Sequence, residues 1–360
     1  MQKGDSLVIR TDASSKIGIG HLMRCLALAQ ALARKGLNVI FISGKEDLSA
    51  SHILLQYGFS PHLIENNIEQ ERDAELTCEI AARYQSRLIV IDHYKLQELF
   101  RTRVKSRGFY LLVIDDIADQ DRITADLILN QNFGAESLLS RYKEITPLAN
   151  DYLLGECYVM FREEILNQGK NIRISREHHL QQLIGNKRNP NILVTFGGSD
   201  PLGLTPQTIS ILKEIPSSLY HRILIVLGAN APIFTKEAAQ KEIQDLPSAE
   251  VFINPKISEL MGEADIAITA GGSTIYELAF LGVAPVIIRV AENQNRVCQN
   301  FARKGSAIVL FDPKDMKTLK KSILHLLSNV ALISEYARTN MKLIDGKGVD
   351  RVVEHILNMV

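Results

Sequence analysis

The chain has 360 residues, of which 46% are hydrophobic and 23% are charged, and its 41 basic residues balance its 41 acidic residues. This length is typical of two domains, and the composition is that of an ordinary globular protein. The formal net charge of zero argues against a non-specific nucleic-acid binder, and no apolar run approaches the ~18 residues that a membrane helix needs.

The cysteines and the first residues indicate the cellular compartment. Four cysteines lie far apart and form neither a CxxC pair nor a Cys/His cluster at zinc spacing. Lys3, Asp5, Arg10 and Asp12 precede any long apolar run, which is unlike a signal peptide. We therefore expect a cytoplasmic protein with reduced thiols and no stable membrane insertion. The sequence leaves the oligomeric state open.

The first predicted elements are a strand, a glycine-bearing loop and a helix. Leu7-Val8-Ile9 is a short apolar run, and helical spacing of apolar residues follows Gly20 until Gly36 ends it. In an open α/β sheet such a loop lies at the carboxyl end of a parallel strand, where ligands bind. Gly18 and Gly20 would let a ligand approach the backbone closely.

His21 stands in the first turn of this helix. Unpaired N–H groups and the positive end of the helix dipole favour an anion there and disfavour an imidazolium. A neutral imidazole can accept a proton, so His21 is a candidate general base. A histidine that only caps or lines the turn would fit the same local pattern.

Short apolar runs then alternate with helical patterns, which predicts a buried parallel sheet covered by helices. Strands are expected near residues 39–42, 62–65, 88–91, 110–114, 126–132 and 152–155. Helices are expected near residues 49–57, 68–84 and 96–107. Polar residues follow several of these strands, and in a parallel sheet they would share one edge with the His21 loop.

The pattern weakens between residues 147 and 189. A helix begins near residue 161, and the polar stretch 174–190 is interpreted as part of a connection between domains. We assign residues 1–165 to an N-terminal domain, joined by a C-terminal helix at 346–360. Residues 166–190 form the predicted connection, and residues 191–345 form a C-terminal domain.

A second α/β pattern begins at residue 191. Its strands are expected near residues 192–196, 223–227, 250–253, 265–269, 285–290 and 307–311. Its helices are expected up to residue 215, near 235–244, 258–264 and 274–281, up to 304, and near 315–328, with a last one near 348–358. The sequence thus predicts an α/β protein with two Rossmann-like domains facing each other across a cleft.

The stretch Gly271-Gly272-Ser273-Thr274 is the second candidate ligand loop. A strand ends there, two glycines free the backbone, and a serine or threonine caps a new helix, so the loop could hold a diphosphate without a metal. Glu277 could contact a ribose. It could equally complete a capping box with Thr274, in which case it would point back to the backbone.

Other candidate sites are weaker. Residues 197–199, Gly-Gly-Ser, form a similar loop, but neither loop has the dinucleotide fingerprint or the P-loop ending, which disfavours nicotinamide and ATP. Asp92-His93 and Asp115-Asp116 follow strands and could bind a metal, although such residues more often cap loops and no third ligand is evident. The chain has no G-x-S-x-G motif, which disfavours serine hydrolase chemistry.

Eight motifs in one order carry a family resemblance. They are RTDASSKIGIGHLMRCLALAQAL, VIDHY, LLVIDD, LILNQN, FREE, TFGGSDP, AGGSTIYELAFLGVAPVII and ENQ. Together they resemble the UDP-sugar hydrolases of pseudaminic acid biosynthesis and their spore coat polysaccharide relatives, over almost the whole chain. That family is in turn similar to the peptidoglycan glycosyltransferase that uses UDP-N-acetylglucosamine.

The resemblance implies a glycosyltransferase-B fold and a UDP-sugar substrate. The expected substrate is UDP-2,4-diacetamido-2,4,6-trideoxy-β-L-altropyranose, although the exact sugar isomer stays open. Water would attack the anomeric carbon and release UDP with inversion, without a metal or another cofactor.

The resemblance also implies roles for individual residues. His21 matches the general base, and Tyr94 and Asn293 match positions near the sugar and the attacking water. Glu277 matches the ribose contact, and Ser273 and Thr274 match the diphosphate loop. The further candidates for substrate contacts are Gly18, Gly20, Arg162, Gly198, Ser199, Gly272 and Gln294.

Two other functions fit the same motifs. A glycosyltransferase would use the same cleft with a sugar or lipid acceptor, and would release UDP only when that acceptor is present. A non-catalytic nucleotide-sugar binder would bind tightly without any turnover.

Overall fold

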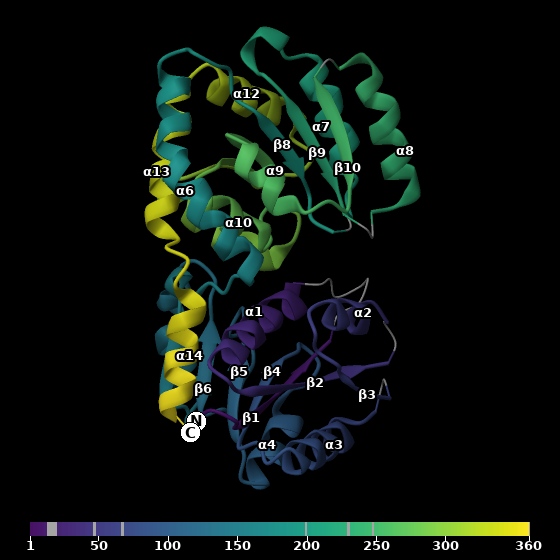
Figure 1. Cartoon of the computed structure of the whole chain (residues 1–360), viewed down its shortest axis with the longest axis vertical. Coiled ribbons are helices and arrows are strands. Elements are labelled where there is room, and N and C mark those ends of the chain that lie inside the picture. Colours follow the sequence, from purple (N-terminus) through teal and green to yellow (C-terminus); the bar gives the residue numbers. More distant parts are fainter. Residues whose placement is uncertain are drawn as a thin grey trace. The chain divides into compact units, whose positions relative to one another are not determined.

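Two groups of parallel strands organise the chain. Their strands are short, continuous apolar runs, as expected for sheets that helices cover on both faces. The computed structural model describes residues 1–12, 20–45, 48–65, 68–198, 200–228, 231–246 and 248–359 (Figure 1). The chain divides into unit 1, which comprises Met1–Glu163 and Gly346–Val360, and unit 2, which comprises Glu164–Asp345.

Within the described residues, unit 1 is built on a seven-stranded parallel sheet in the order β3-β2-β1-β4-β5-β6-β7. Its strands are β1 (Ser6–Thr11), β2 (Asn38–Gly44), β3 (His62–Ile64), β4 (Leu88–Asp92), β5 (Tyr110–Ile114), β6 (Leu127–Asn130) and β7 (Asp151–Leu154). The chain adds β2 and β3 on one side of β1 and then returns to place β4 on the other side. The carboxyl ends of β1 and β4 therefore flank the point where the strand order reverses, which is where open α/β sheets bind ligands.

The helices of unit 1 come from both ends of the sequence. They are α1 (Gly20–Arg34), α2 (Leu48–Gln56), α3 (Gln70–Arg83), α4 (Glu98–Ser106), α5 (Leu139–Ile145) and α14 (Gly348–Met359), with short 3₁₀ turns η1 (Ala135–Leu138) and η2 (Glu156–Tyr158). Helix α14 packs against α1 and buries Val349, Val352, Val353 and Ile356. The α-amino group of Met1 donates to the Leu357 carbonyl at 2.9 Å, and both chain ends lie together in Figure 1.

Unit 2 repeats the architecture with a six-stranded parallel sheet among its described residues, in the order β10-β9-β8-β11-β12-β13. Its strands are β8 (Ile192–Thr195), β9 (Ile223–Leu227), β10 (Ala249–Ile253), β11 (Ile266–Ala270), β12 (Ala284–Ile288) and β13 (Ile308–Leu310). The order reverses between β8 and β11, so the glycine loops after these two strands occupy the switch point of this sheet. The predicted fold class of two Rossmann-like α/β domains is confirmed.

Eight helices of unit 2 lie within the described residues. They are α6 (Glu163–Ile184), α7 (Leu204–Lys213), α8 (Ile233–Glu242), α9 (Ile257–Glu263), α10 (Thr274–Phe280), α11 (Asn295–Arg303), α12 (Met316–Leu327) and α13 (Val330–Leu343), with 3₁₀ turns η3 (Ser217–Leu219), η4 (Ile243–Asp245) and η5 (Glu292–Gln294). Helix α13 had no predicted counterpart. A helix was predicted to begin near residue 161, and α6 begins there but extends through most of the expected connection.

The expected connection at residues 166–190 is mostly the helix α6 and belongs to unit 2. Leu180 and Leu183 are buried in the core of that unit. Arg176 is also fully buried, and its guanidinium donates to the Leu281 and Ala264 carbonyls, each at 2.9 Å. These carbonyls belong to helix ends that need external donors. This stretch is therefore a helix with one exposed polar face and one buried face that includes Arg176, and not a linker between the domains.

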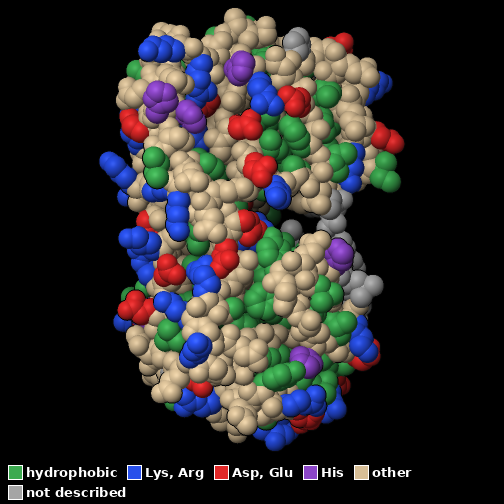
Figure 2. All heavy atoms as spheres, viewed as in Figure 1, with side chains coloured by type: hydrophobic (Ala, Val, Ile, Leu, Met, Phe, Trp, Pro, Cys, Tyr) green, Lys and Arg blue, Asp and Glu red, His purple; other side chains and the backbone are tan. Residues whose placement is uncertain are grey.

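The surface carries charges of both signs. On the face drawn in Figure 2, basic and acidic side chains are interspersed over both units, in keeping with the formal net charge of zero. Among the helices that the structure describes, none combines the length and the hydropathy that crossing a membrane would require.

Candidate active site

The start of α1 and the end of β4 meet at the switch point of unit 1. His21 is the second residue of α1, and its side chain is largely buried. Its Nδ1 lies 2.5 Å from Oδ1 of Asp92, the last residue of β4. The pairing of β1 with β4 places Asp92 opposite Thr11, the residue that ends β1. The fold thus joins a histidine and a carboxylate that are 71 residues apart in the sequence.

The state of Asp92 decides which nitrogen of His21 carries the proton. Burial alone would raise the pKa of the Asp92 carboxyl, but Arg24 and His21 hold that pKa well below its usual range. An ionised carboxylate only accepts hydrogen bonds, so the hydrogen-bond network assigns a proton to Nδ1 of His21. In the neutral ring Nε2 then carries the lone pair, and it has no hydrogen-bond partner among the described residues. This is the arrangement that a general base requires.

The sequence pattern located only the start of α1 beside His21. The structure adds a fully buried carboxylate in direct contact with the ring. The helix pattern could not locate this carboxylate, because it comes from the end of β4.

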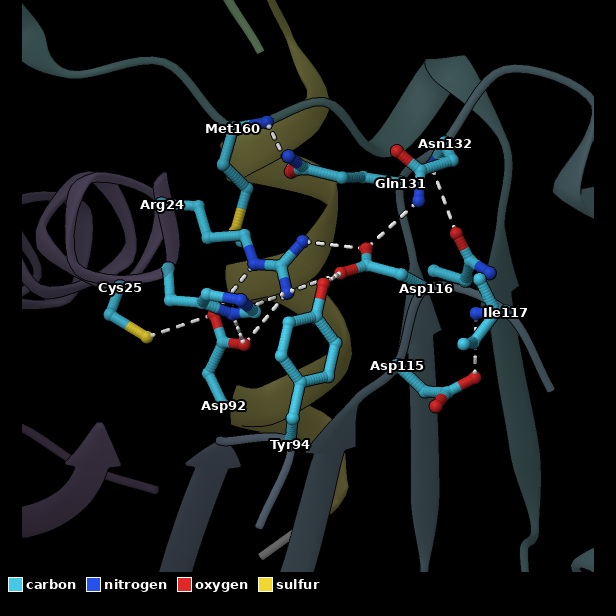
Figure 3. Close-up of polar contacts among 12 residues, drawn as sticks. Arg24, Cys25, Asp92, Tyr94, Asp115, Asp116, Ile117, Gln131, Asn132 and Met160 are labelled. Atoms are coloured by element: carbon cyan, nitrogen blue, oxygen red, sulfur yellow. Dashed lines mark hydrogen bonds and ion pairs between the residues drawn. The ribbon is translucent and has the colours of Figure 1, made fainter. Parts of the chain in front are cut away.

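Arg24 lies one turn after His21 on α1 and joins two carboxylates (Figure 3). Its Nε and Nη2 donate to the two oxygens of Asp92 at 2.6 and 2.7 Å. Its Nη1 and Nη2 donate to the two oxygens of Asp116 at 2.7 and 3.1 Å. Burial would lower the pKa of Arg24, but Asp116 and Asp92 raise it, so the guanidinium stays charged. Its Nη2 lies 3.0 Å from Nδ1 of His21 because both nitrogens donate to the same Asp92 oxygen.

Asp116, just after β5, accepts hydrogen bonds from two more side chains. The Tyr94 hydroxyl and the Asn132 amide each donate to it at 2.8 Å. Burial and the neighbouring Asp116 raise the pKa of Tyr94, which keeps its hydroxyl protonated. The Tyr94 ring stands edge-on to the His21 ring, with the centroids 4.5 Å apart and the planes at 90°. The structure therefore brings Tyr94 to His21, and its role as a substrate contact stays a prediction.

A second histidine–aspartate pair lies at the same sheet edge. Nε2 of His93 lies 2.8 Å from Asp12, which also binds Arg10 at 2.5 Å and accepts from the Gly44 N–H at 2.8 Å. Nδ1 of His93 accepts from the backbone N–H groups of residues 95 and 96, at 3.0 and 3.2 Å. Burial opposes ionisation of Asp12, but His93 and Arg10 hold its pKa well below the usual range. Both nitrogens of His93 are therefore occupied, and the pair ties the loops after β1, β2 and β4 together.

The carboxylates considered as metal ligands have other partners. Asp115 accepts from the Tyr142 hydroxyl at 2.6 Å and from the Ala118 N–H at 2.8 Å, and burial raises its pKa. Asp92 and Asp116 are bound to Arg24 as described above. Within the part of the chain that the structure describes, no three His, Cys, Asp or Glu side chains gather in a group that could hold a metal ion.

The glycines of unit 2 differ in what surrounds them. A Cβ on Gly271 would come within 2.6 Å of the Cys298 sulfur, whereas a Cβ on Gly272 or on Gly198 would meet nothing within 4 Å. A Cβ on Gly228, after β9, would collide with the backbone of Gly198 at 2.3 Å. Gly271 and Gly228 are therefore required by internal packing, and Gly272 and Gly198 leave open space beside the backbone.

The start of α10 differs from the predicted capping box. Its N-cap residue is Ser273, whose side chain makes no capping hydrogen bond, and Thr274 is the first helical residue. In a capping box the acidic side chain stands three residues after the N-cap. That position is Tyr276 here, so Glu277 is out of register for the predicted box with Thr274. The ribose contact of Glu277 stays a prediction.

Three other residues were predicted to contact the substrate, and the structure shows where their side chains lie. The Arg162 guanidinium donates to the Tyr57 hydroxyl at 3.0 Å. The Gln294 side chain accepts from the Val290 N–H at 2.9 Å and so holds the turn between β12 and α11. Asn293 lies in that same turn and is exposed. The substrate contacts predicted for these residues have not been tested.

Three predicted substrate contacts remain, which are Gly18, Gly20 and Ser199. Gly20 is the first residue of α1 and is exposed. Gly18 and Ser199 lie outside the described residues.

Sequence reasoning missed Arg24, Asp116 and Asn132. Arg24 could have been found from its spacing, because residues three apart on a helix share one face and His21 precedes it by three. Asp116 was considered only as a loop cap or a metal ligand. Asn132 follows β6 and carried no signal of its own, since its contact with Asp116 depends on how two strand ends lie side by side.

Comparison with known proteins shows similarity to sugar-nucleotide enzymes. Residues 192–352 match the glycosyltransferase family 28 C-terminal domain. An uncharacterized protein of Methanocaldococcus jannaschii is 27% identical over 308 residues, or 83% of this chain and 59% of that protein. The spore coat polysaccharide biosynthesis protein SpsG of Bacillus subtilis is 30% identical over 165 residues, or 45% of this chain and 48% of that protein. The chain thus spans about half the length of these two relatives.

A third relative is matched over nearly its whole length. The UDP-2,4-diacetamido-2,4,6-trideoxy-β-L-altropyranose hydrolase of Campylobacter jejuni is 24% identical over 302 residues, which cover 83% of this chain and 97% of that protein. This chain is therefore similar to a protein of the class that the eight motifs resemble.

Solved structures place the fold in the glycosyltransferase-B class. MurG of Acinetobacter baumannii has a TM-score of 0.68 and 16% identity, with 98% of this chain and 99% of that chain covered. The UDP-GlcNAc 2-epimerase of Neisseria meningitidis, solved with UDP-GlcNAc, has a TM-score of 0.66 and 10% identity, with 98% and 100% covered. Identities this low establish the fold alone, and one fold can serve different reactions.

Proposed function

We propose that the protein hydrolyses UDP-2,4-diacetamido-2,4,6-trideoxy-β-L-altropyranose to UDP and the free sugar. The observation that carries the proposal is the His21–Asp92 pair at the switch point of unit 1, which leaves Nε2 of His21 without a partner among the described residues. The similarity to the Campylobacter jejuni hydrolase over 97% of its length supports the choice of substrate.

In the proposed reaction, a water oxygen attacks the anomeric carbon while the bond from that carbon to the diphosphate oxygen breaks. One proton of the water passes to Nε2 of His21, and UDP leaves with the bonding electron pair. Attack from the side opposite the leaving group inverts the anomeric configuration. Asp92 keeps its negative charge, fixes the ring through Nδ1 and stabilises the imidazolium that forms.

We further propose that unit 2 binds the UDP moiety. Backbone N–H groups at Gly272, Ser273 and Thr274 would hold the diphosphate, and Glu277 would bind the ribose. The match of residues 192–352 to a glycosyltransferase domain supports this assignment. The open space beside the backbone of Gly272 supports it as well, because a phosphate must approach that backbone closely.

The experiment is a turnover assay with the purified chain and the synthetic nucleotide sugar in EDTA. UDP release is followed by chromatography and the configuration of the first sugar product by proton NMR. We expect UDP and the free sugar in equal amounts, with inverted anomeric configuration. Absence of turnover, or retention of configuration, would refute the proposal. A panel of UDP-linked diacetamido isomers measured in parallel would identify the preferred sugar.

The match of residues 192–352 to glycosyltransferase family 28 also favours a second candidate function. An inverting glycosyltransferase would use the same base to deprotonate an acceptor hydroxyl instead of water. The two functions differ in one observable. A hydrolase releases UDP from the nucleotide sugar alone, whereas a transferase releases it at a comparable rate only after a sugar or lipid acceptor is added.

A further inference from the structure

The two groups that hold the His21 ring, Asp92 and Tyr94, are both linked to Asp116, the first through Arg24 and the second directly. Asp92 holds Nδ1 of His21, and Arg24 connects Asp92 to Asp116 through paired hydrogen bonds. Tyr94 holds the ring from another side by its edge-on contact, and its hydroxyl donates to the same Asp116. No hydrogen bond joins Asp116 to His21 among the described residues, and the two interact directly only through their charges. The contacts by which Asp116 can hold the orientation of the ring therefore pass through Arg24 and Tyr94.

The four hydrogen bonds from Arg24, Tyr94 and Asn132 require a carboxylate at this position. One oxygen of Asp116 accepts from Nη1 of Arg24 and from the Asn132 amide, and the other accepts from Nη2 of Arg24 and from the Tyr94 hydroxyl. An asparagine side chain would replace one oxygen with an N–H donor. In either orientation that donor would face an N–H of Arg24, which has no acceptor to offer.

The charges of the cluster give Asp116 a second effect. The Arg24 and Asp116 side chains are each only 11% exposed, and the Asp92 side chain is fully buried. Burial would raise the pKa of Asp116, but Arg24 lowers it, so the carboxylate is ionised. Without the Asp116 carboxylate Arg24 would keep one carboxylate partner, and at least one of its part-buried N–H groups would lose its acceptor. A buried donor without an acceptor is costly, so the guanidinium would reorient and disturb Asp92.

We propose that Asp116 is a positioning residue, which holds the His21 ring in its reactive orientation through Arg24 and Tyr94. The inference rests on the proposed function of His21 as the base. It assigns the second aspartate of the LLVIDD motif a task that differs from that of its neighbour. Within the described part of the chain, Asp115 binds the Tyr142 hydroxyl and the Ala118 N–H, and not Arg24 or Tyr94.

The test compares Asp116→Asn with the matched variant Asp115→Asn in the full chain. Two quantities are measured: kcat and KM for the nucleotide sugar, and the downfield proton resonance of the His21 Nδ1–H in protein labelled with ¹⁵N-histidine. His21→Asn identifies that resonance by removing it. For Asp116→Asn we expect loss of the resonance and a fall in kcat of about 10²-fold with little change in KM, since a small misplacement of a reacting group has that effect. Asp115→Asn should keep the resonance and kcat.

Two results would overturn the proposal. One is that Asp116→Asn keeps the resonance and has kcat within about twofold of the wild type, a difference too small for the orientation effect above. The other is a fall in kcat with the resonance intact, because Asp116 would then act on the substrate directly. If Asp116→Asn does not fold, Arg24→Lys replaces it, since a lysine cannot form the paired hydrogen bonds to both carboxylates. The resonance is read without substrate, so an absence of hydrolysis in the wild type would refute the proposed function and still leave the positioning of His21 measurable.

Discussion

The two histidine–aspartate pairs of unit 1 lie at one edge of one sheet and are bonded in opposite ways. In the first pair Nδ1 of His21 donates to Asp92, and Nε2 has no partner among the described residues. In the second pair Nε2 of His93 binds Asp12, and Nδ1 accepts from two backbone N–H groups. A histidine beside a carboxylate is therefore not a sufficient sign of a base. Among the described residues, His21 keeps a ring nitrogen available for the proton transfer proposed above, whereas both ring nitrogens of His93 are used in holding loops together.

The largest effect should come from removing Nε2 of His21. Asparagine cannot accept a proton at neutral pH, so His21→Asn should lower kcat by about 10³-fold, within the range for general acid–base catalysis. UDP release in EDTA measures the rate, and circular dichroism checks that the variant folds. Wild-type activity in His21→Asn would remove the mechanistic distinction between the two pairs.

The second pair should affect stability instead of rate. His93→Ala leaves the Asp12 carboxylate short of a donor and two backbone N–H groups without their acceptor. We expect the free energy of unfolding to fall by about 1 kcal/mol, the net value of a typical hydrogen bond, because the groups left unpaired are exposed or part-buried and water can reach them. Urea denaturation measures this change, and kcat should stay within a few-fold of the wild type. Loss of turnover at unchanged stability would instead place His93 in the chemistry.

Both pairs should make the fold sensitive to acid. The pKa values of Asp12 and Asp92 are held well below the usual value of 3.8, so the unfolded chain binds more protons than the native state as the pH falls past that value. The stability that these carboxylates contribute is complete above the unfolded pKa and is lost progressively as the pH falls towards their folded pKa values. Thermal unfolding followed between about pH 5 and pH 2 should show this fall of stability with pH, because aspartates titrate in that acid range. Asp12→Asn should flatten the slope, and a slope equal to that of the wild type would contradict the assignment.

The smallest effect concerns two neighbouring glycines in unit 2, Gly271 and Gly272. The backbone of Gly271 is enclosed by other atoms, and that of Gly272 has open space beside it. Gly272 has open space at the position of a Cβ, so Gly272→Ala should fold normally and raise KM by a few-fold if a diphosphate lies there. Gly271→Ala would bring a Cβ within 2.6 Å of the Cys298 sulfur, so it should lower the melting temperature. Steady-state kinetics and thermal unfolding separate the two outcomes. An unchanged KM in Gly272→Ala would argue against the diphosphate assignment.

Most of the fold could be predicted from the sequence, because strands buried on both faces are continuous apolar runs between helical patterns. One error arose where a polar stretch was taken as a connection between domains. Residues 174–184 of that stretch are helical, and Arg176 within it is buried among helix-end carbonyls. Helix α13 was missed although the sequence carries signals for it. Asn329 caps its start, and Ile333 and Ala337 are buried at helical spacing.

The site could be predicted only in part. The position of His21 at a helix start follows from the order of strand, glycines and apolar periodicity. Its bonding to Asp92 could not be predicted, because that contact depends on the register of β1 against β4 and on side-chain orientation. For the same reason the sequence could not show which ring nitrogens of His21 and His93 donate and which accept hydrogen bonds. The link from Asp116 through Arg24 joins three separate segments, and no local pattern encodes it.

The return of α14 to unit 1 has a consequence for biosynthesis. Residues 346–359 leave the ribosome after every strand of both sheets, yet the apolar side of α14 packs on α1 and on the turn η2 near the end of the first half. Every residue of unit 2 precedes that helix in the sequence, whereas unit 1 lacks part of its hydrophobic packing until the helix is present. A chain truncated after residue 345 should therefore contain a protease-resistant unit 2 and a protease-sensitive unit 1.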